Sequence, residues 1–103
     1  MRKHQQLRAW QQAMDLVVLI YSMTANFPLT EQCGLTSQMQ RAAVSVASNI
    51  AEGAARGSLS ELETQCQIAQ RLGYTADISA LEMAINALFS QLGGLIKHLK
   101  ASL

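Results

Sequence analysis

The sequence predicts an all-α fold: an antiparallel up-down-up-down four-helix bundle, in one domain over residues 1–103, that assembles into a homo-oligomer. Half of the 103 residues are hydrophobic but only 5 % are aromatic, and there is one proline, a composition typical of an aliphatic helical core. Apolar residues recur at alternating spacings of three and four in four segments. The connections between these segments are short, which favours antiparallel packing of consecutive helices.

The first predicted helix covers residues 5–26 and is more apolar than one core requires. One seam at helical spacing consists of Leu7, Trp10, Met14, Val17, Tyr21 and Thr24. A second seam beside it consists of Ala13, Leu16, Ile20, Met23 and Phe27. Because a chain of this size buries only about two-thirds of its unfolded surface, part of this wide stripe should face another chain.

We assign the oligomer interface to four residues of the second seam: Leu16, Ile20, Met23 and Phe27. Trp10 and Tyr21, on the first seam, are interpreted as anchors of the core or of an interface.

The second predicted helix covers residues 36–52 and carries polar side chains within a small, apolar sequence. Four of them share one face at spacings of three and four: Arg41, Ser45, Asn49 and Glu52. They form either a polar active site or a structural polar network that fixes helix register, in which serines bond backbone carbonyl groups. We favour the structural network.

The third predicted helix covers residues 58–72. Ser58 and Glu61 match a capping box, in which each side chain accepts a hydrogen bond from the backbone N–H of the other residue. We therefore place the start of this helix at Ser58.

The fourth predicted helix covers residues 77–100, and Asp77 suits its N-cap. Its apolar residues alternate by three and four without a break: Ile78, Leu81, Ile85, Leu88, Leu92, Leu95 and Leu99. Gly93 and Gly94 interrupt this helix at a cost of roughly 1 kcal/mol each relative to alanine. Close contact with a neighbouring helix, or a kink, would account for them.

Residue types that support catalysis or metal binding are scarce. Cys33 and Cys66 form no metal motif, and we interpret both as buried, reduced thiols. His4 and His98 lie near the two ends, and no nucleophile triad or Glu-x-x-His pair is present. We therefore predict a protein that is not an enzyme, with no catalytic residue, metal, cofactor or small-molecule substrate.

Neither a membrane span nor a signal peptide is expected. The most hydrophobic stretch is LVVLIY, far shorter than the roughly 20 residues of a transmembrane helix. Glutamines follow the basic first residues, where a signal peptide needs an apolar run. The sequence thus predicts a cytoplasmic protein with no membrane partner.

The net charge is only +1, but the charges are unevenly distributed in the predicted bundle. Six basic residues fall at one end: Arg2, Lys3, Arg8, Arg56, Lys97 and Lys100. Three acidic residues share that end: Glu52, Glu61 and Glu63. Such a basic end either binds RNA or DNA by neutralising phosphates or is simply solvated. No aromatic residue lies among these charges to stack on bases, which favours the solvated surface.

Four blocks of sequence carry a family resemblance: LRAWQQAMDLVVLIYSMTANFP, GLTSQMQRAAVSVASNIAEG, ARGSLSELETQCQIAQRLGY and LGGLIKHLK. They resemble, over nearly the whole chain, the four-helix-bundle proteins encoded in intervening sequences of bacterial 23S ribosomal RNA genes. The resemblance implies a homopentamer. A related branch comprises accessory proteins of diversity-generating retroelements, which partner a reverse transcriptase and contact nucleic acid.

The sequence departs from this family between Arg56 and Gly57, where a stretch of roughly four helical turns is missing. Either the third helix is shortened or a mobile segment is absent from the sequence. We favour the second, because a half-length third helix would expose the seams of its neighbours. Ser58 would then lie inside a helix rather than at its start.

Residues and resemblance together predict a non-enzymatic oligomeric protein, a nucleic-acid-associated accessory factor that binds RNA or DNA through its basic end. The alternative is a protein–protein interaction scaffold with no nucleic-acid role, whose partner docks on the spare apolar seam of the first helix.

Overall fold

The computed structural model describes residues 3–50 and 53–101, and it describes side chains for residues 6–50 and 53–93. It contains four α-helices: α1 (Lys3–Thr24), α2 (Leu35–Ser48), α3 (Ala55–Arg71) and α4 (Ser79–Ala101). A short 3-10 helix, η1 (Leu29–Glu31), lies in the connection between α1 and α2. The prediction of an all-α protein is confirmed.

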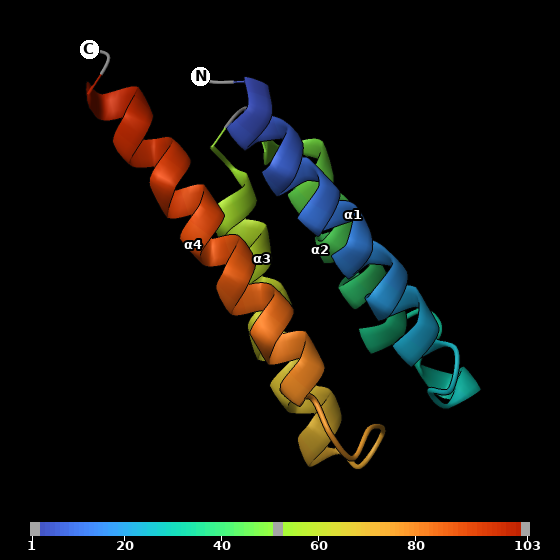
Figure 1. The fold of residues 1–103 in the computed structure, drawn as a ribbon. Coiled ribbons are helices and arrows are strands. Elements are labelled where there is room, and N and C mark those ends of the chain that lie inside the picture. The colour runs from blue at the N-terminus through green and yellow to red at the C-terminus, as the bar shows by residue number, and fades with distance from the viewer. Residues whose placement is uncertain (1–2, 51–52, 102–103) are drawn as a thin grey trace.

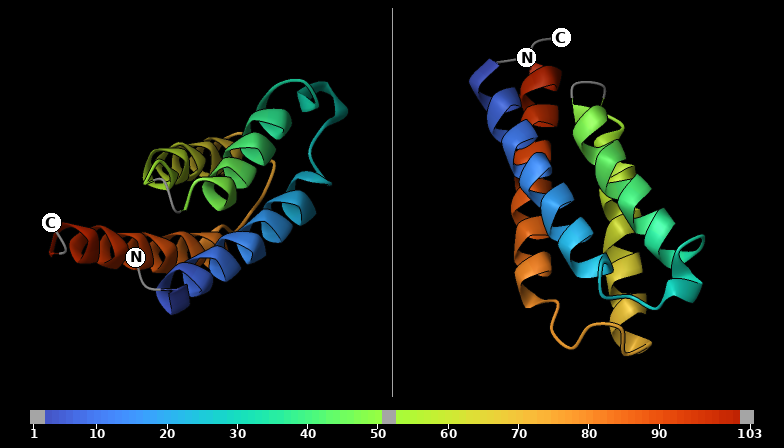
Figure 2. Two further views of the ribbon diagram at one scale, coloured as in Figure 1. Left: turned by 90° about the horizontal axis from the view of Figure 1, so that it is seen from above. Right: turned by 90° about the vertical axis from the view of Figure 1, so that its right-hand side faces the viewer.

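The four helices pack compactly as a bundle. Consecutive helices run in opposite directions and pack against each other, and α4 returns beside α1 (Figure 1). Seen from above, α1 and α4 form one layer and α2 and α3 form the other (Figure 2). The beginnings of α1 and α3 and the ends of α2 and α4 therefore lie at the same end of the molecule, as the sequence predicts.

The core is built from aliphatic side chains of all four helices. Its largest fully buried members are Leu16, Ile20, Met39, Val46, Leu59, Leu62, Cys66, Ile85 and Leu88. Alanines at positions such as Ala13 and Ala43 are also fully buried, and their small size lets helix axes approach closely. The regular seam of α4 is core from Ile78 to Leu92.

The structure corrects the assignment of the two seams on α1. Leu16, Ile20 and Phe27 lie in the core of the chain itself, exposed by 1 %, 0 % and 7 %, and Met23 is half-buried against that core. They cannot present an open surface to another copy. Most of the other seam faces outward instead: Leu7, Trp10, Met14 and Tyr21 are exposed, whereas Val17 is half-buried and Thr24 is buried. The reason is that Ala9, Ala13, Leu16 and Ile20 point at the bundle axis and turn the first seam away from it.

The predicted capping box at Ser58 is wrong. The third helix begins at Ala55, and Ala54 at its N-cap makes no side-chain hydrogen bond. Gly53, with φ of 77°, reverses the chain directly before this helix, a conformation that favours glycine. The Ser58 hydroxyl is hydrogen-bonded to the Ser45 hydroxyl, 2.8 Å away.

The α2 helix ends at Ser48, earlier than predicted. Asn49 follows it, and its side-chain amide donates a hydrogen bond of 2.8 Å to the Ser45 carbonyl oxygen. The Ser45 carbonyl also accepts a hydrogen bond of 3.1 Å from the Asn49 backbone N–H, so both the side chain and the backbone of Asn49 bond the last helical turn.

Arg56 and Gly57 are consecutive residues of α3, which runs without interruption for 17 residues. This length is less than the 22 residues of α1 and the 23 of α4. The expected exposure of neighbouring seams by a shortened third helix does not occur in the described residues, because Ile85, Leu88 and Leu92 remain buried.

Candidate assembly face and basic end

The most distinctive surface of the molecule is an apolar strip on the outer side of α1 and α2, here called the α1–α2 face. It consists of Leu7, Trp10, Met14, Val17, Val18 and Tyr21 from α1 and of Val44 and Ala47 from α2. Six of these are among the large apolar side chains that stay exposed, with exposed fractions from 39 % for Met14 to 64 % for Val18. Val17 and Ala47 are half-buried between them.

The two helices form a shallow groove along this face. Trp10, Met14 and Val17 line one side of a depression of about 230 Å³, and Val44, Ala47 and Ser48 line the other. Farther along, the Gln40 side-chain amide donates a hydrogen bond of 3.1 Å to the Thr24 hydroxyl, which joins α2 to α1. Large apolar patches on a monomer of this kind commonly mark interaction sites.

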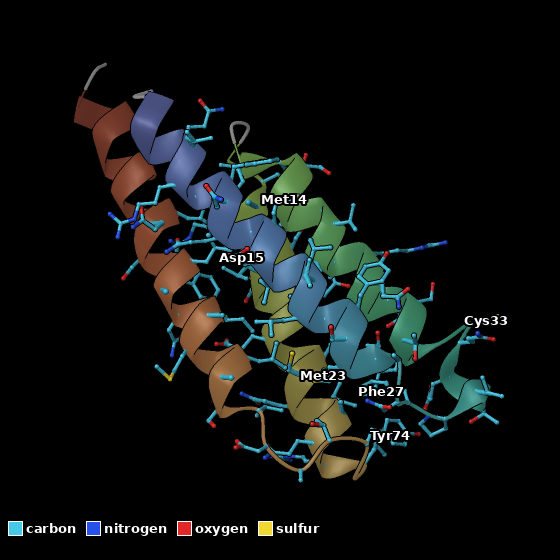
Figure 3. The ribbon with its side chains drawn as sticks, turned by 45° about the vertical axis from the view of Figure 1, so that its right-hand side comes forward. Met14, Asp15, Met23, Phe27, Cys33 and Tyr74 are labelled. Carbon is cyan, nitrogen blue, oxygen red and sulfur yellow. The ribbon has the colours of Figure 1, made fainter. Side chains whose placement is uncertain are left out.

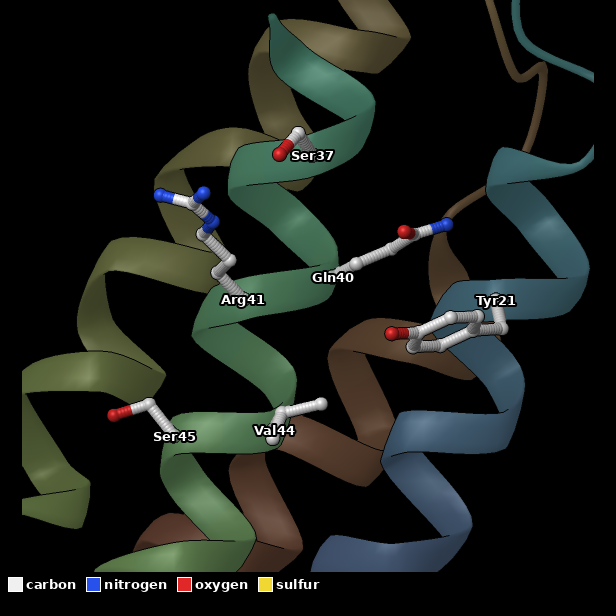
Figure 4. A pocket seen from close by; sticks show the side chains of 6 residues that line it. All are labelled: Tyr21, Ser37, Gln40, Arg41, Val44 and Ser45. Atoms are coloured by element: carbon white, nitrogen blue, oxygen red, sulfur yellow. The ribbon is translucent and has the colours of Figure 1, made fainter. Parts of the chain in front are cut away.

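A second depression, of about 500 Å³, continues the face across the outer side of α2. Tyr21 is its contribution from α1, and α2 contributes Ser37, Gln40, Arg41, Val44 and Ser45 (Figure 4). The Tyr21 ring lies toward Gln40 and Val44, whereas Arg41 and Ser45 point away from it, toward α3. The apolar strip therefore gives way to polar side chains on the far side of α2.

Two of the four residues predicted as a polar network form one. The Ser45 hydroxyl bonds the Ser58 hydroxyl, and the Asn49 amide donates both to that Ser45 hydroxyl, at 3.1 Å, and to the Ser45 carbonyl. This cluster is partly buried between α2 and α3. Arg41 is exposed on the outer side of α2, apart from the cluster, and Glu52 lies outside the described residues.

The described part of the predicted basic end consists mainly of Arg8 and Arg56, both exposed. Lys3 is the first residue of α1, and Lys97 and Lys100 belong to the last turns of α4 at the same end (Figure 1), but their side chains lie outside the described set. Arg2 lies outside the described residues. Glu61 and Glu63 lie farther along α3.

Arg56 makes a contact that the sequence did not reveal. Its guanidinium lies over the ring of Phe89 on α4, with Cζ 5.4 Å from the ring centroid. One guanidinium nitrogen is 3.6 Å from the point that a side chain at Gly93 would first occupy. The group that approaches Gly93 most closely is therefore an arginine side chain, not the backbone of a neighbouring helix.

A second missed contact joins the two connections at the opposite end of the bundle. The Tyr74 hydroxyl donates a hydrogen bond of 2.7 Å to Glu31, and its ring lies 5.3 Å from that of Phe27 (Figure 3). The other Glu31 oxygen accepts a bond from the Leu35 backbone N–H at the start of α2. The Glu31 carboxylate raises the pKa of Tyr74, mainly through this hydrogen bond. Because 43 residues separate Glu31 and Tyr74, no local pattern predicts their contact.

The two cysteines differ from the prediction that both are buried. Cys33 is exposed on the connection before α2 (Figure 3), where no helix covers it. Cys66 is buried in the core, and this burial, with smaller effects of Glu63 and Glu82, raises its pKa to about 11. A thiol with such a pKa is a poor nucleophile at neutral pH.

Among the described side chains, those of residues 6–50 and 53–93, no group of three or more His, Cys, Asp or Glu residues is placed to hold a metal ion. Within residues 3–50 and 53–101, every helix is too short or too polar to cross a membrane. The α4 helix begins at Ser79, two residues after the predicted start at Asp77. The Asp77 carboxylate accepts hydrogen bonds from the Ser79 backbone N–H and hydroxyl, which lower its pKa.

Comparison with known proteins identifies a family for this chain. No curated protein significantly matches the chain. The family model of the 23S rRNA-intervening sequence protein matches residues 5–56, which include nearly all of α1, all of α2 and the whole α1–α2 face. The match ends at Arg56. Since the matched region spans half of the chain, the protein belongs to the 23S rRNA-intervening sequence protein family.

Proposed function

We propose that this protein is a non-enzymatic assembly protein whose copies associate through the α1–α2 face. In this proposal the assembly, a homopentamer as the family resemblance implies, collects the basic ends of its subunits and binds RNA or DNA through them. The observation that carries the proposal is the exposed apolar face itself. No other outer surface in the described part of the chain gathers as many exposed apolar side chains.

A second copy of the chain is the occupant that this face fits best. A standard protein interface buries roughly 800 Å² per partner, and six large apolar side chains of this face are 39–64 % exposed in the single chain. The face contains no charged side chain, and charges are depleted at the centres of such interfaces. Exposed groups of opposite sign border it, Asp15 on α1 and Arg41 on α2, so one edge is complementary to the other edge of a second copy.

Assembly would increase the affinity of the basic ends for nucleic acid. One subunit carries few positive charges at this end, and isolated surface charges bind nucleic acid weakly. Phosphate binding grows with the number of phosphates neutralised, so a ring of several ends would bind far more tightly than one. This part of the proposal is supported by the arrangement of the helices: α1 and α3 begin, and α2 and α4 end, at the same end of the bundle (Figure 1).

Light scattering on two matched variants tests the assembly. Val18 and Met83 are both highly exposed, at 64 % and 73 %, and glutamate at either position should leave the fold intact. We expect Val18→Glu to reduce the mass to that of the 11.2 kDa chain, because it places a charge in the face. Met83→Glu should keep the wild-type mass. A monomeric wild-type protein, or an unchanged mass for Val18→Glu, would contradict the proposal.

Titration of labelled single-stranded RNA and DNA tests the second part of the proposal, that the assembly binds nucleic acid. We expect the wild-type protein to bind both, with an affinity that falls steeply as salt increases from about 50 to 200 mM. Val18→Glu should bind much more weakly than Met83→Glu, because it separates the basic ends. Absence of binding by wild-type protein at low salt would remove the nucleic-acid role.

A protein-binding scaffold is the second candidate, favoured by Trp10 and Tyr21 on the face. These residue types dominate the energetic centres of protein interfaces. This candidate predicts a monomeric wild-type protein that binds a partner protein after nuclease treatment, with binding lost in Val18→Glu and kept in Met83→Glu.

A further inference from the structure

Arg56 is held against α4 in a way that distinguishes it from Arg8. It lies in the first turn of α3, and its guanidinium covers the ring of Phe89 at 5.4 Å. Phe89 is half-buried and packed against the core, so it provides a fixed support. The same guanidinium also lies beside Gly93, one helical turn beyond Phe89, where it would be in van der Waals contact with a Cβ atom at 3.6 Å.

The contact with Phe89 is a cation–π contact, and the phenyl ring offers no oxygen or nitrogen acceptor to the guanidinium. An arginine carries five N–H donors, so this contact leaves them available for an oxygen acceptor. Among the side-chain hydrogen bonds of the described residues, none involves Arg56. The result is a positioned cation whose donors form no side-chain hydrogen bond with the described residues.

We propose that Arg56, positioned by Phe89, binds one phosphate group of the nucleic-acid backbone. This inference rests on the proposed nucleic-acid role of the basic end and names the residue and the contact. A planar guanidinium matches a phosphate with two parallel N–H donors, which gives the contact a defined geometry. Because the side chain is already restricted by Phe89, less conformational entropy is lost when a phosphate binds.

Arg56→Gln, with Arg71→Gln as its matched control, tests the phosphate contact. Both arginines are exposed on α3, but Arg71 is its last residue and lies at the opposite end. Binding is measured by fluorescence anisotropy with single-stranded RNA and with DNA of the same sequence at several salt concentrations. We expect Arg56→Gln to reduce the slope of log affinity against log salt by about 0.7 for each subunit whose Arg56 contacts the strand, the value for one phosphate of a single strand. Arg71→Gln should keep the wild-type slope.

Arg56→Lys and Phe89→Leu test the positioning. Both keep the positive charge, so the salt slope should remain at the wild-type value. Loss of the ring–guanidinium contact should weaken binding about twofold to fivefold, the equivalent of an exposed cation–π pair. Arg56→Lys carries this test independently if Phe89→Leu disturbs the core, because Arg56 is exposed.

The outcomes separate this inference from the proposed function. Wild-type binding with equal slopes for Arg56→Gln and Arg71→Gln would overturn the role of Arg56 and leave the proposed function standing. Wild-type affinity in Arg56→Lys would overturn the positioning by Phe89. No binding by the wild-type protein would overturn both proposals. Equal effects on RNA and DNA identify the phosphate as the group recognised, and an effect on one alone would contradict a backbone contact.

Discussion

The outer surfaces of α1 and α3 differ, although each of these helices buries one stripe in the same core. The exposed positions of α3 carry mainly polar residues, such as Ser60, Glu61, Thr64, Gln67 and Arg71. Those of α1 beside α2 carry Leu7, Trp10, Met14, Val18 and Tyr21. The outside of α3 is an ordinary solvated surface, whereas this side of α1 is composed like an interface.

The comparison with α4 leads to the same conclusion. The described apolar seam of the fourth helix, from Ile78 just before α4 to Leu92, is buried entirely in the core. In α1 one seam is buried in the core, and most residues of the other regular seam are exposed on the surface. Regular apolar spacing therefore indicates burial but does not tell whether the burial is within the chain or against another one.

The largest expected effect comes from replacing one leucine with alanine in each seam of α1 and comparing the two losses of stability. Leu16 is 1 % exposed and Leu7 is 60 % exposed. We expect Leu16→Ala to reduce the free energy of unfolding by about 2–5 kcal/mol, because it leaves a cavity in the core. Leu7→Ala should change it by less than about 0.5 kcal/mol. Urea unfolding of both variants measures the difference.

Both variants should carry Val18→Glu, so that unfolding is measured without a contribution from assembly. The unmodified Val18→Glu protein is the reference. A similar loss of stability from the two leucines would mean that the two seams of α1 are not divided between core and surface.

The sequence was sufficient to predict the helices and the end at which the basic segments meet, because both follow from periodicity and short connections. It could not decide which seam of α1 faces the core. That choice depends on a rotation of the helix by a fraction of a turn, and both seams contain residues of similar hydrophobicity. Leu16 and Trp10 are both of residue types that are commonly buried in protein interiors.

The contacts of the candidate sites were less predictable than the fold. The cluster of Ser45 and Asn49 was expected from their spacing on one helix, but its third member, Ser58, was mistaken for a helix cap. Arg56 was recognised by its charge alone, and Phe89, which positions it, lies 33 positions away along the chain. Such pairs form only when the helices pack, so no short stretch of the sequence indicates them.

A smaller loss of stability is expected at the contact between α2 and α3, which joins the α1–α2 helical hairpin to the α3–α4 helical hairpin. Ser58→Ala removes the hydroxyl that bonds Ser45 across α2 and α3, and we expect a loss of about 0.5–1.5 kcal/mol in unfolding free energy. Ser60→Ala, two residues away on the exposed side of α3, is the matched control. It shares the gain in helix propensity from serine to alanine, so subtracting its effect isolates the hydrogen bond. Equal effects of the two changes would show that the bond contributes nothing.

The smallest expected effect concerns Tyr74, which joins the connections of the two hairpins through Glu31. Its pKa is raised above 10.0, chiefly because its hydroxyl donates a hydrogen bond to the Glu31 carboxylate. The stabilisation is therefore complete below pH 10 and is lost as the pH rises through the raised pKa. We expect wild-type protein to be more stable than Tyr74→Phe at pH 8, and this advantage to disappear at alkaline pH. Thermal unfolding of both proteins across this range measures it. In the Glu31→Gln background, where the carboxylate is absent, the same comparison should depend much less on pH; an unchanged dependence would show that Glu31 is not the partner that links the two hairpins.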